Sequence, residues 1–174
     1  MSTSTFTLAV LGLVINGLGL VFIATQVGLA RRQIRNVLEQ ATAKASRLKR
    51  QATIDFYMST LERLANWRIE LPDEWDKEAV SAYIDRIYEP NHQEEGRTLA
   101  SYLGYFETIA MAVRSDIYDL VVLDGIAGSR IVNITNNYRV FFQRRRAEVR
   151  ASSAYENVEW LGRQITQLRK SRGP

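Results

Sequence analysis

The first thirty residues of the chain carry no charged side chain, and from Phe6 to Ala30 the sequence is dense in aliphatic residues and glycine. A helix of this length reaches roughly 37 Å, enough to cross a hydrocarbon core of about 30 Å. A cleaved signal peptide ordinarily starts with a basic residue, and no Lys or Arg precedes Arg31. A core helix of a soluble domain is rarely apolar on every face for so long. Residues 1–30 therefore predict a single transmembrane anchor.

The segment that follows the apolar run is strongly basic. Residues 31–50 carry seven basic residues and one acidic residue, whereas the other flank offers only Ser, Thr and the amino terminus. The positive-inside rule therefore predicts an amino terminus outside and a cytoplasmic remainder. Anionic lipid headgroups attract such juxtamembrane cations. The side chains that we expect to contact lipid are Arg31, Arg32, Arg35, Lys44 and Arg47.

Small and polar residues of the apolar run share one helical stripe. At steps of three and four, this stripe contains Thr5, Ala9, Gly12, Asn16, Gly19, Ile23 and Gln26. Glycine permits close approach of a second helix, and an amide near the middle of the membrane needs a hydrogen-bond partner. Single Gly or Asn residues are also tolerated in membrane helices. Their coincidence on one side favours a helix-packing face made by Gly12, Asn16, Gly19 and Gln26.

A second apolar pattern predicts a helical stalk over residues 31–52. It alternates between steps of four and three through Ile34, Leu38, Ala41, Ala45, Leu48 and Ala52. This a/d pattern is typical of a short coiled coil, although its many alanines give only a modest seam. Beyond it the pattern shifts, and we expect Ile54, Met58, Leu61 and Ala65 to face the core of a bundle formed by residues 53–174, with Phe56, Tyr57, Leu64 and Trp67 widening that stripe.

The rest of the chain reads as about four further helices with no convincing strand, so the predicted fold class is all-α. We expect the first bundle helix to end at Leu71, before Pro72. We expect the next helix to be capped by Asp73 and to bury residues from Trp75 to Tyr88. A further helix is expected from about Gln93 to Arg114, and another from about Leu120 to Val149, capped by Asp116 or Asp119. The last helix is expected to begin with a capping box from Ser153 to Glu156.

The composition excludes several chemistries. Cysteine is absent, and the single histidine, His92, lies beside Pro90 and Asn91 in an expected loop. Disulfides, thiolate nucleophiles and Cys-ligated metals are therefore excluded, and a Ser-His-Asp triad within one chain would need His92. We interpret His92 as a solvated loop residue. The sequence predicts no catalytic residue, no metal, no cofactor and no enzymatic activity.

Two other groups of residues suggest chemistry only superficially. Gly125, Gly128, Ser129 and Arg130 resemble a glycine-rich phosphate loop, but no strand precedes them and no Lys-Ser/Thr pair follows, so we favour close helix packing or a local break. Four acids bracket a turn, where helix caps are the usual explanation and a metal or acid–base role is the alternative. These acids are Glu107, Asp116, Asp119 and Asp124.

Arginines interleaved with aromatics mark the part of the chain near residue 140. They are Arg139, Arg144, Arg145, Arg146 and Arg150, among Tyr138, Phe141 and Phe142. Such a segment can pair with acids of its own domain, dock on anionic lipid or a protein partner, or bind nucleic acid. Residues 51–124 carry a charge of −9 and residues 125–174 a charge of +7. We rank internal pairing first and nucleic acid last, because the acidic middle repels phosphates.

The chain from Tyr102 to Ile165 resembles an uncharacterised bacterial family of small membrane-anchored helical proteins, DUF4760. The resemblance lies in Tyr105-Phe106-Glu107, Ile117-Tyr118-Asp119, Ile126-Ala127-Gly128, the segment Tyr138 to Arg146, and Tyr155 to Leu161. It covers about the last sixty residues and, more loosely, the whole layout. Gly125 departs from the family pattern. The resemblance implies an architecture in the bacterial inner membrane and no activity.

We therefore expect a membrane-anchored, non-enzymatic accessory or scaffold protein. Its expected partners are membrane lipid and either further copies of itself or another membrane protein, contacted through the transmembrane stripe and the stalk. The alternative is a membrane-tethered nucleic-acid-binding or phage-response effector that uses the arginines from Arg139 to Arg150. A third possibility, an enzyme using the acids near Asp116 and Asp124, has no ligand-spacing motif behind it.

Overall fold

The computed structural model describes residues 3–150 and 152–173, with side chains described from residue 26 onward except at position 149. The predicted membrane-packing residues Gly12, Asn16 and Gly19 lie outside the described side chains, and Gln26 is exposed. Among the residues that are described, no helix is long and apolar enough to cross a membrane. The transmembrane anchor of residues 1–30 thus stays a prediction.

The described residues form an all-α structure, which confirms the predicted fold class. It contains α1 (Thr3–Ser59), α2 (Leu61–Glu70), α3 (Lys77–Arg86), α4 (Gln93–Arg114), α5 (Leu120–Asn137), α6 (Arg139–Val149) and α7 (Glu156–Arg172), and no strand. The chain divides into two compact units, Met1–Ala45 and Ser46–Pro174.

In the first unit, every side chain described from Gln26 to Ala45 is exposed. This part of α1 exposes large apolar side chains, among them Ile34 at 61 %, Val37 at 63 % and Leu38 at 59 %. The cations predicted to contact lipid are exposed there too, and Arg47 is exposed in the second unit. Their contact with lipid stays a prediction.

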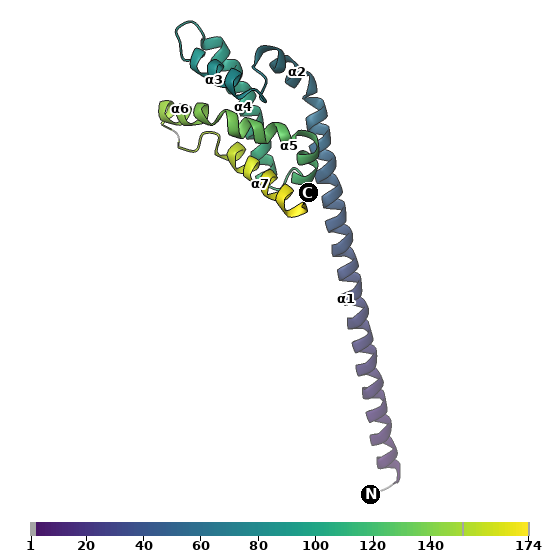
Figure 1. Cartoon of the computed structure of the whole chain (residues 1–174). Helices are drawn as coiled ribbons and strands as arrows, with labels where there is room; N and C mark the ends of the chain where they lie inside the picture. Colours follow the sequence, from purple (N-terminus) through teal and green to yellow (C-terminus); the bar gives the residue numbers. More distant parts are fainter. Residues whose placement is uncertain (1–2, 151, 174) are drawn as a thin grey trace. The chain divides into compact units, whose positions relative to one another are not determined.

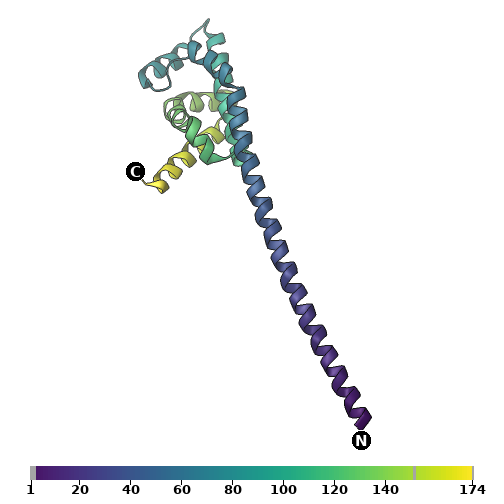
Figure 2. The ribbon, with the colours of Figure 1, turned by 90° about the vertical axis from the view of Figure 1, so that its right-hand side faces the viewer.

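The second unit is built around α4, α5 and α7. α4 contributes more buried residues than any other described helix, and among them Leu99, Leu103 and Phe106 retain no exposed surface. α7 packs against both α4 and α5, and α2 packs against α4 (Figure 1; Figure 2). The apolar stripe of α4, repeated every three to four residues, is what draws these helices together.

The first bundle helix breaks at Thr60, where the sequence predicts no interruption. Thr60 has φ −108° and ψ 2°, and its hydroxyl lies 2.7 Å from the Tyr105 hydroxyl and within hydrogen-bond distance of the Phe56 and Tyr57 carbonyl oxygens. A hydroxyl that bonds to the preceding turn competes with the regular helix ladder. The break divides the expected helix into the end of α1 and α2.

The core-facing stripe predicted here is partly wrong. Met58 is 60 % exposed, Ile54 and Leu61 are about 40 % exposed, and Ala65 is also exposed. The residues predicted to widen the stripe make the core contacts instead: Leu64 is buried, and Phe56, Tyr57 and Trp67 pack against the core. Aromatic pairing sets this face, because the Phe56 ring stacks on Tyr105 at 5.8 Å and meets Tyr118 at 5.2 Å.

The helix expected from Leu120 to Val149 is also divided, at Tyr138. Tyr138 has φ −93° and ψ 10°, and its side chain is completely buried. Phe141 and Phe142 are buried beside it. The interruption turns α6 so that all three aromatic side chains enter the core. Burial of their large apolar surface is the main contribution that stabilises this arrangement.

Predicted helix ends are confirmed in some places and wrong in others. α4 spans the predicted Gln93–Arg114, and Asp119 caps α5 as expected. α3 begins one turn later than predicted, because Asp76 rather than Asp73 accepts from Ala79 N–H. Trp75, predicted to be buried, is 60 % exposed.

The capping box predicted at the start of α7 is absent. Tyr155 occupies the N-cap position with φ 61° and makes no side-chain cap bond, while Ser153 contributes only its backbone oxygen, which accepts from Glu156 N–H at 3.1 Å. The start of α7 is instead capped by Glu107, which lies on α4.

Candidate functional site

The four acids singled out in the sequence do not converge on one site. Among the described residues, no group of three or more His, Asp or Glu side chains is placed to hold a metal ion. Each acid instead has partners of its own that explain its position.

Glu107, in the middle of α4, caps the amino terminus of α7. Its carboxylate accepts hydrogen bonds from the Val158 backbone N–H at 2.8 Å, from the Asn157 side-chain amide at 2.7 Å and from the Asn157 backbone N–H at 3.3 Å. Backbone N–H groups in the first turn of a helix lack internal partners and favour negative charge. Glu107, which is half-buried, therefore has a structural role.

Asp116 and Asp119 tie the end of α1 to the start of α5. Asp116 forms an ion pair with Lys49, and Asp119 accepts from Val121 and Val122 N–H at 2.9 and 3.0 Å and pairs with Arg50 at 3.4 Å. Partial burial alone would raise the pKa of Asp119, but these hydrogen bonds outweigh it and lower the pKa. An ionised cap of this kind is a poor proton donor.

Asp124 and Gly128 explain the apparent glycine-rich loop. Both lie within α5, so these residues form a helix and not a phosphate cradle. The Asp124 carboxylate, 8 % exposed, pairs with Arg169 of α7 at 2.8 Å. A Cβ on Gly128 would lie 2.2 Å from Asp124 Oδ1 and 2.7 Å from Arg169 Nη2, so glycine leaves room for this pair. The geometry matches close helix packing, the favoured interpretation of the sequence.

Arg130, the last residue of that motif, holds a buried acid of another segment. Its Nε donates to Glu74 Oε1 at 2.6 Å, and the two side chains are 19 % and 6 % exposed. Asn137 Nδ2 donates to the Glu74 backbone oxygen at 2.9 Å. Together these contacts fix the connection between α2 and α3 onto α5.

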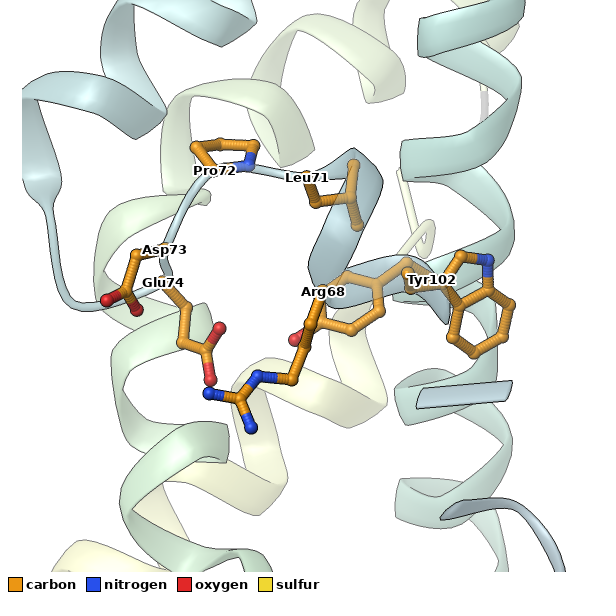
Figure 3. Close-up of a pocket in the computed structure, with 7 residues that line it drawn as sticks. Arg68, Leu71, Pro72, Asp73, Glu74 and Tyr102 are labelled. Atoms are coloured by element: carbon orange, nitrogen blue, oxygen red, sulfur yellow. The ribbon is translucent and has the colours of Figure 1, made fainter. Parts of the chain in front are cut away.

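A cavity of about 160 Å³ lies beside Glu74. It is lined by Trp67, Arg68, Leu71, Pro72, Asp73, Glu74 and Tyr102. In Figure 3, the charged ends of Arg68 and Glu74 lie on the same side of the cavity and point toward one another. The Tyr102 hydroxyl is buried and has no hydrogen-bond partner among the described residues.

The side chains that line this cavity can form hydrogen bonds. Burial first, and the Glu74 carboxylate second, raise the pKa of Tyr102, which keeps the phenol neutral at physiological pH. Glu74 is engaged by Arg130. The cavity thus offers polar groups suited to ordered water or one small polar molecule, without a paired acid and base.

Three of the five arginines near residue 140 pair with acids of the same domain. Arg144 pairs with Asp85 at 2.8 Å, Arg145 with Glu148 at 3.1 Å, and Arg146 with Glu159 at 2.8 Å. Arg150 is exposed at the carboxyl end of α6, with φ 49°. The aromatics expected to stack nucleic-acid bases, Tyr138, Phe141 and Phe142, are all buried, so they offer no stacking platform.

The remaining arginine, Arg139, lines a groove between α5, α6 and α7. The groove has a volume of about 410 Å³. Its lining residues are Thr135, Asn136, Arg139, Gln143, Arg146, Glu159 and Arg163. A neighbouring depression of about 260 Å³ shares Thr135, Asn136 and Arg163 and adds Lys170, so the two form one basic surface.

Arg163 and Lys170 are the cations that sequence reasoning missed. They lie seven residues apart on α7 and therefore on one helical face. The sequence shows this spacing. That Arg139 lies in the same groove, however, depends on the packing of α7 beside α5 and α6, which no local pattern predicts.

The domain as a whole has a recognisable family pattern. The family described as "Domain of unknown function (DUF4760)" matches residues 7–165. The chain belongs to the DUF4760 family. This confirms the resemblance seen in the sequence, and it assigns no activity. No curated protein and no solved structure matches the chain. Membrane anchoring and a bacterial origin stay predictions for this DUF4760 chain.

Proposed function

We propose that this DUF4760 chain is a membrane-anchored, non-enzymatic accessory protein that self-associates through its stalk and its transmembrane stripe. The observation that carries the proposal is the exposed apolar seam on α1. Ile34, Leu38 and Leu48 are each about 60 % exposed, at the d, a and d positions of a heptad pattern. Large apolar side chains in such a repeat are ordinarily covered by a partner helix.

A second copy of the same chain is the occupant that best fits this seam. Copies inserted in one membrane with the same orientation bring identical stalks together in parallel and in register. Ala41 and Ala45 between the larger residues allow close approach. In a parallel pair Lys44 would meet Lys49 of the other copy, and the ion pair between Lys49 and Asp116 within each copy reduces that repulsion.

The transmembrane stripe and the stalk seam fall on neighbouring faces of the helical pattern. The transmembrane stripe ends at Gln26, whereas the stalk seam, extended backward by its own spacing, reaches Val27. One residue corresponds to a rotation of about 100° on an α-helix. A helix that uses both faces contacts more than one neighbour, which favours an assembly of more than two copies.

Replacing both Gly12 and Gly19 with Ile is expected to weaken self-association at least severalfold, because branched side chains hold the helices apart. The measurement is association of the full chain in a bacterial membrane two-hybrid assay and by size in detergent. Gly28→Ile is the matched control, since it makes the same change two residues beyond Gln26, away from both the stripe and the backward extension of the stalk seam. Equal association of the Gly12/Gly19 variant and the control would count against the proposal.

A further inference from the structure

We propose that the groove between α5, α6 and α7 binds a phosphate-bearing small molecule through Arg139 and Arg163. This site lies in the second unit and is independent of the self-association proposed above. Arg139 opens α6 and Arg163 lies in α7, and both side chains are exposed into the groove that they line. Two guanidinium groups on different helices can bind one tetrahedral anion from two sides.

The charges that line the groove favour an anion. In the described part of the chain, neither Arg139 nor Arg163 has a carboxylate within ion-pair distance, and the same holds for Lys170 in the adjoining depression. The one acid of the groove, Glu159, is already paired with Arg146 at 2.8 Å. Phosphate bound between the two arginines would therefore meet an excess of positive charge in a partly enclosed site.

The lining of the groove is polar, and one of its side chains is held in place by contacts within the domain. Arg146 is held by the Ala154 backbone oxygen at 2.8 Å as well as by Glu159. Gly162, which lines the adjoining depression, is packed against Thr135 so closely that a Cβ would lie 2.4 Å from the Thr135 hydroxyl oxygen. Asn136 and Gln143 add amide groups that can orient the rest of a ligand. Fixed donors of this kind give specificity beyond simple charge attraction.

The dimensions and lining select the class of ligand. A groove of about 410 Å³ is within the range of small-molecule sites, roughly 300 to 1,000 Å³. No aromatic side chain lines it, whereas single-stranded nucleic acid is typically held by stacking on aromatics. The ligand is therefore a phosphorylated metabolite or the phosphorylated headgroup of a lipid, which share the same recognition chemistry.

The test measures binding of inorganic pyrophosphate to the full chain in nanodiscs of neutral lipid by calorimetry. Arg139→Gln and Arg163→Gln are each expected to weaken binding about tenfold or more, since each removes a charge-assisted contact. Arg150→Gln is the matched control: it makes the same charge change at an exposed residue that does not line the groove. It is expected to alter the affinity less than twofold.

Nanodiscs that contain phosphatidylglycerol separate the two sources of phosphate. Competition by this lipid for pyrophosphate binding, retained in the Arg150→Gln control, identifies the headgroup as the occupant, whereas pyrophosphate binding that the lipid leaves unchanged identifies a soluble ligand. Absence of pyrophosphate binding would overturn the proposal. Equal weakening by all three substitutions would overturn it too, because it would indicate diffuse attraction to the surface. Tighter binding of single-stranded RNA than of pyrophosphate, insensitive to Arg163→Gln, would contradict it as well.

Discussion

Arg130→Met is expected to lower the free energy of unfolding of the second unit by about 3 kcal/mol, because it leaves a buried carboxylate without the cation that donates to it. The Glu74 side chain is 6 % exposed, and Arg130 donates to it at 2.6 Å. Breaking a buried pair from one side ordinarily costs about 3 to 5 kcal/mol, and the residual 19 % exposure of the Arg130 side chain places this pair at the lower end. Urea unfolding of the full chain in micelles, followed by tryptophan fluorescence, measures the change.

The three tryptophans suit this measurement, because Trp67, Trp75 and Trp160 all lie in the second unit. Arg97→Met is the matched control: its pair with Glu94 is 74 % and 83 % exposed, and its loss should cost less than about 0.5 kcal/mol. The double variant Glu74→Gln/Arg130→Met should recover part of the stability, since no buried charge then remains. Equal effects of Arg130→Met and Arg97→Met would contradict the role given to Glu74.

Glu107→Ala is expected to lower the same free energy by about 2 to 3 kcal/mol, because α7 then loses the carboxylate that accepts from its first turn. The residue at the N-cap position, Tyr155, makes no side-chain cap bond that could replace it. The structural consequence should be fraying of the start of α7. Hydrogen exchange of the Asn157 and Val158 amides, measured alongside urea unfolding, reports it directly.

Two further variants distinguish capping from a general loss of charge. Glu107→Gln keeps one acceptor oxygen and should cost about 1 kcal/mol, less than the alanine variant. Glu156→Ala removes an exposed acid from the same helix end, paired with Arg114 at 3.5 Å, and should also cost about 1 kcal/mol or less. If Glu156→Ala proved as damaging as Glu107→Ala, the capping role of Glu107 would be refuted.

Local sequence patterns predict the helices whose apolar period and caps lie within the helix and its flanking residues. The apolar period predicts α4 over Gln93–Arg114, and residue type and position predict Asp116 or Asp119 as the cap of α5, of which Asp119 takes that place. The breaks at Thr60 and Tyr138 were missed because neither residue is a Pro or Gly. Both breaks depend on tertiary contacts: the Tyr105 hydroxyl beside Thr60, and the buried aromatic cluster that receives Tyr138.

The sites depended even more on tertiary packing. The partner of Glu107 lies 50 residues away in sequence, and that of Glu74 lies 56 residues away, so spacing could not pair them. Arg139 was singled out with four neighbours, yet three of those pair with acids and its companion in the groove, Arg163, lies on another helix. Residue type predicts which side chains can form ion pairs or bind anions, whereas tertiary packing determines which of them lie together.

Cysteine cross-linking along the stalk tests self-association most directly, because the natural chain contains no cysteine. Single cysteines are placed from Ile34 to Leu48 in the full chain, and the membranes are oxidised. Disulfides need Cα atoms about 4.4 to 6.8 Å apart, so only residues that face a second copy should react well. We predict strong cross-linking at Ile34, Leu38, Ala41, Ala45 and Leu48, and weak cross-linking at Asn36 and Ala43 on the opposite face. Uniform yields around the helix, or none at any position, would contradict self-association through this seam.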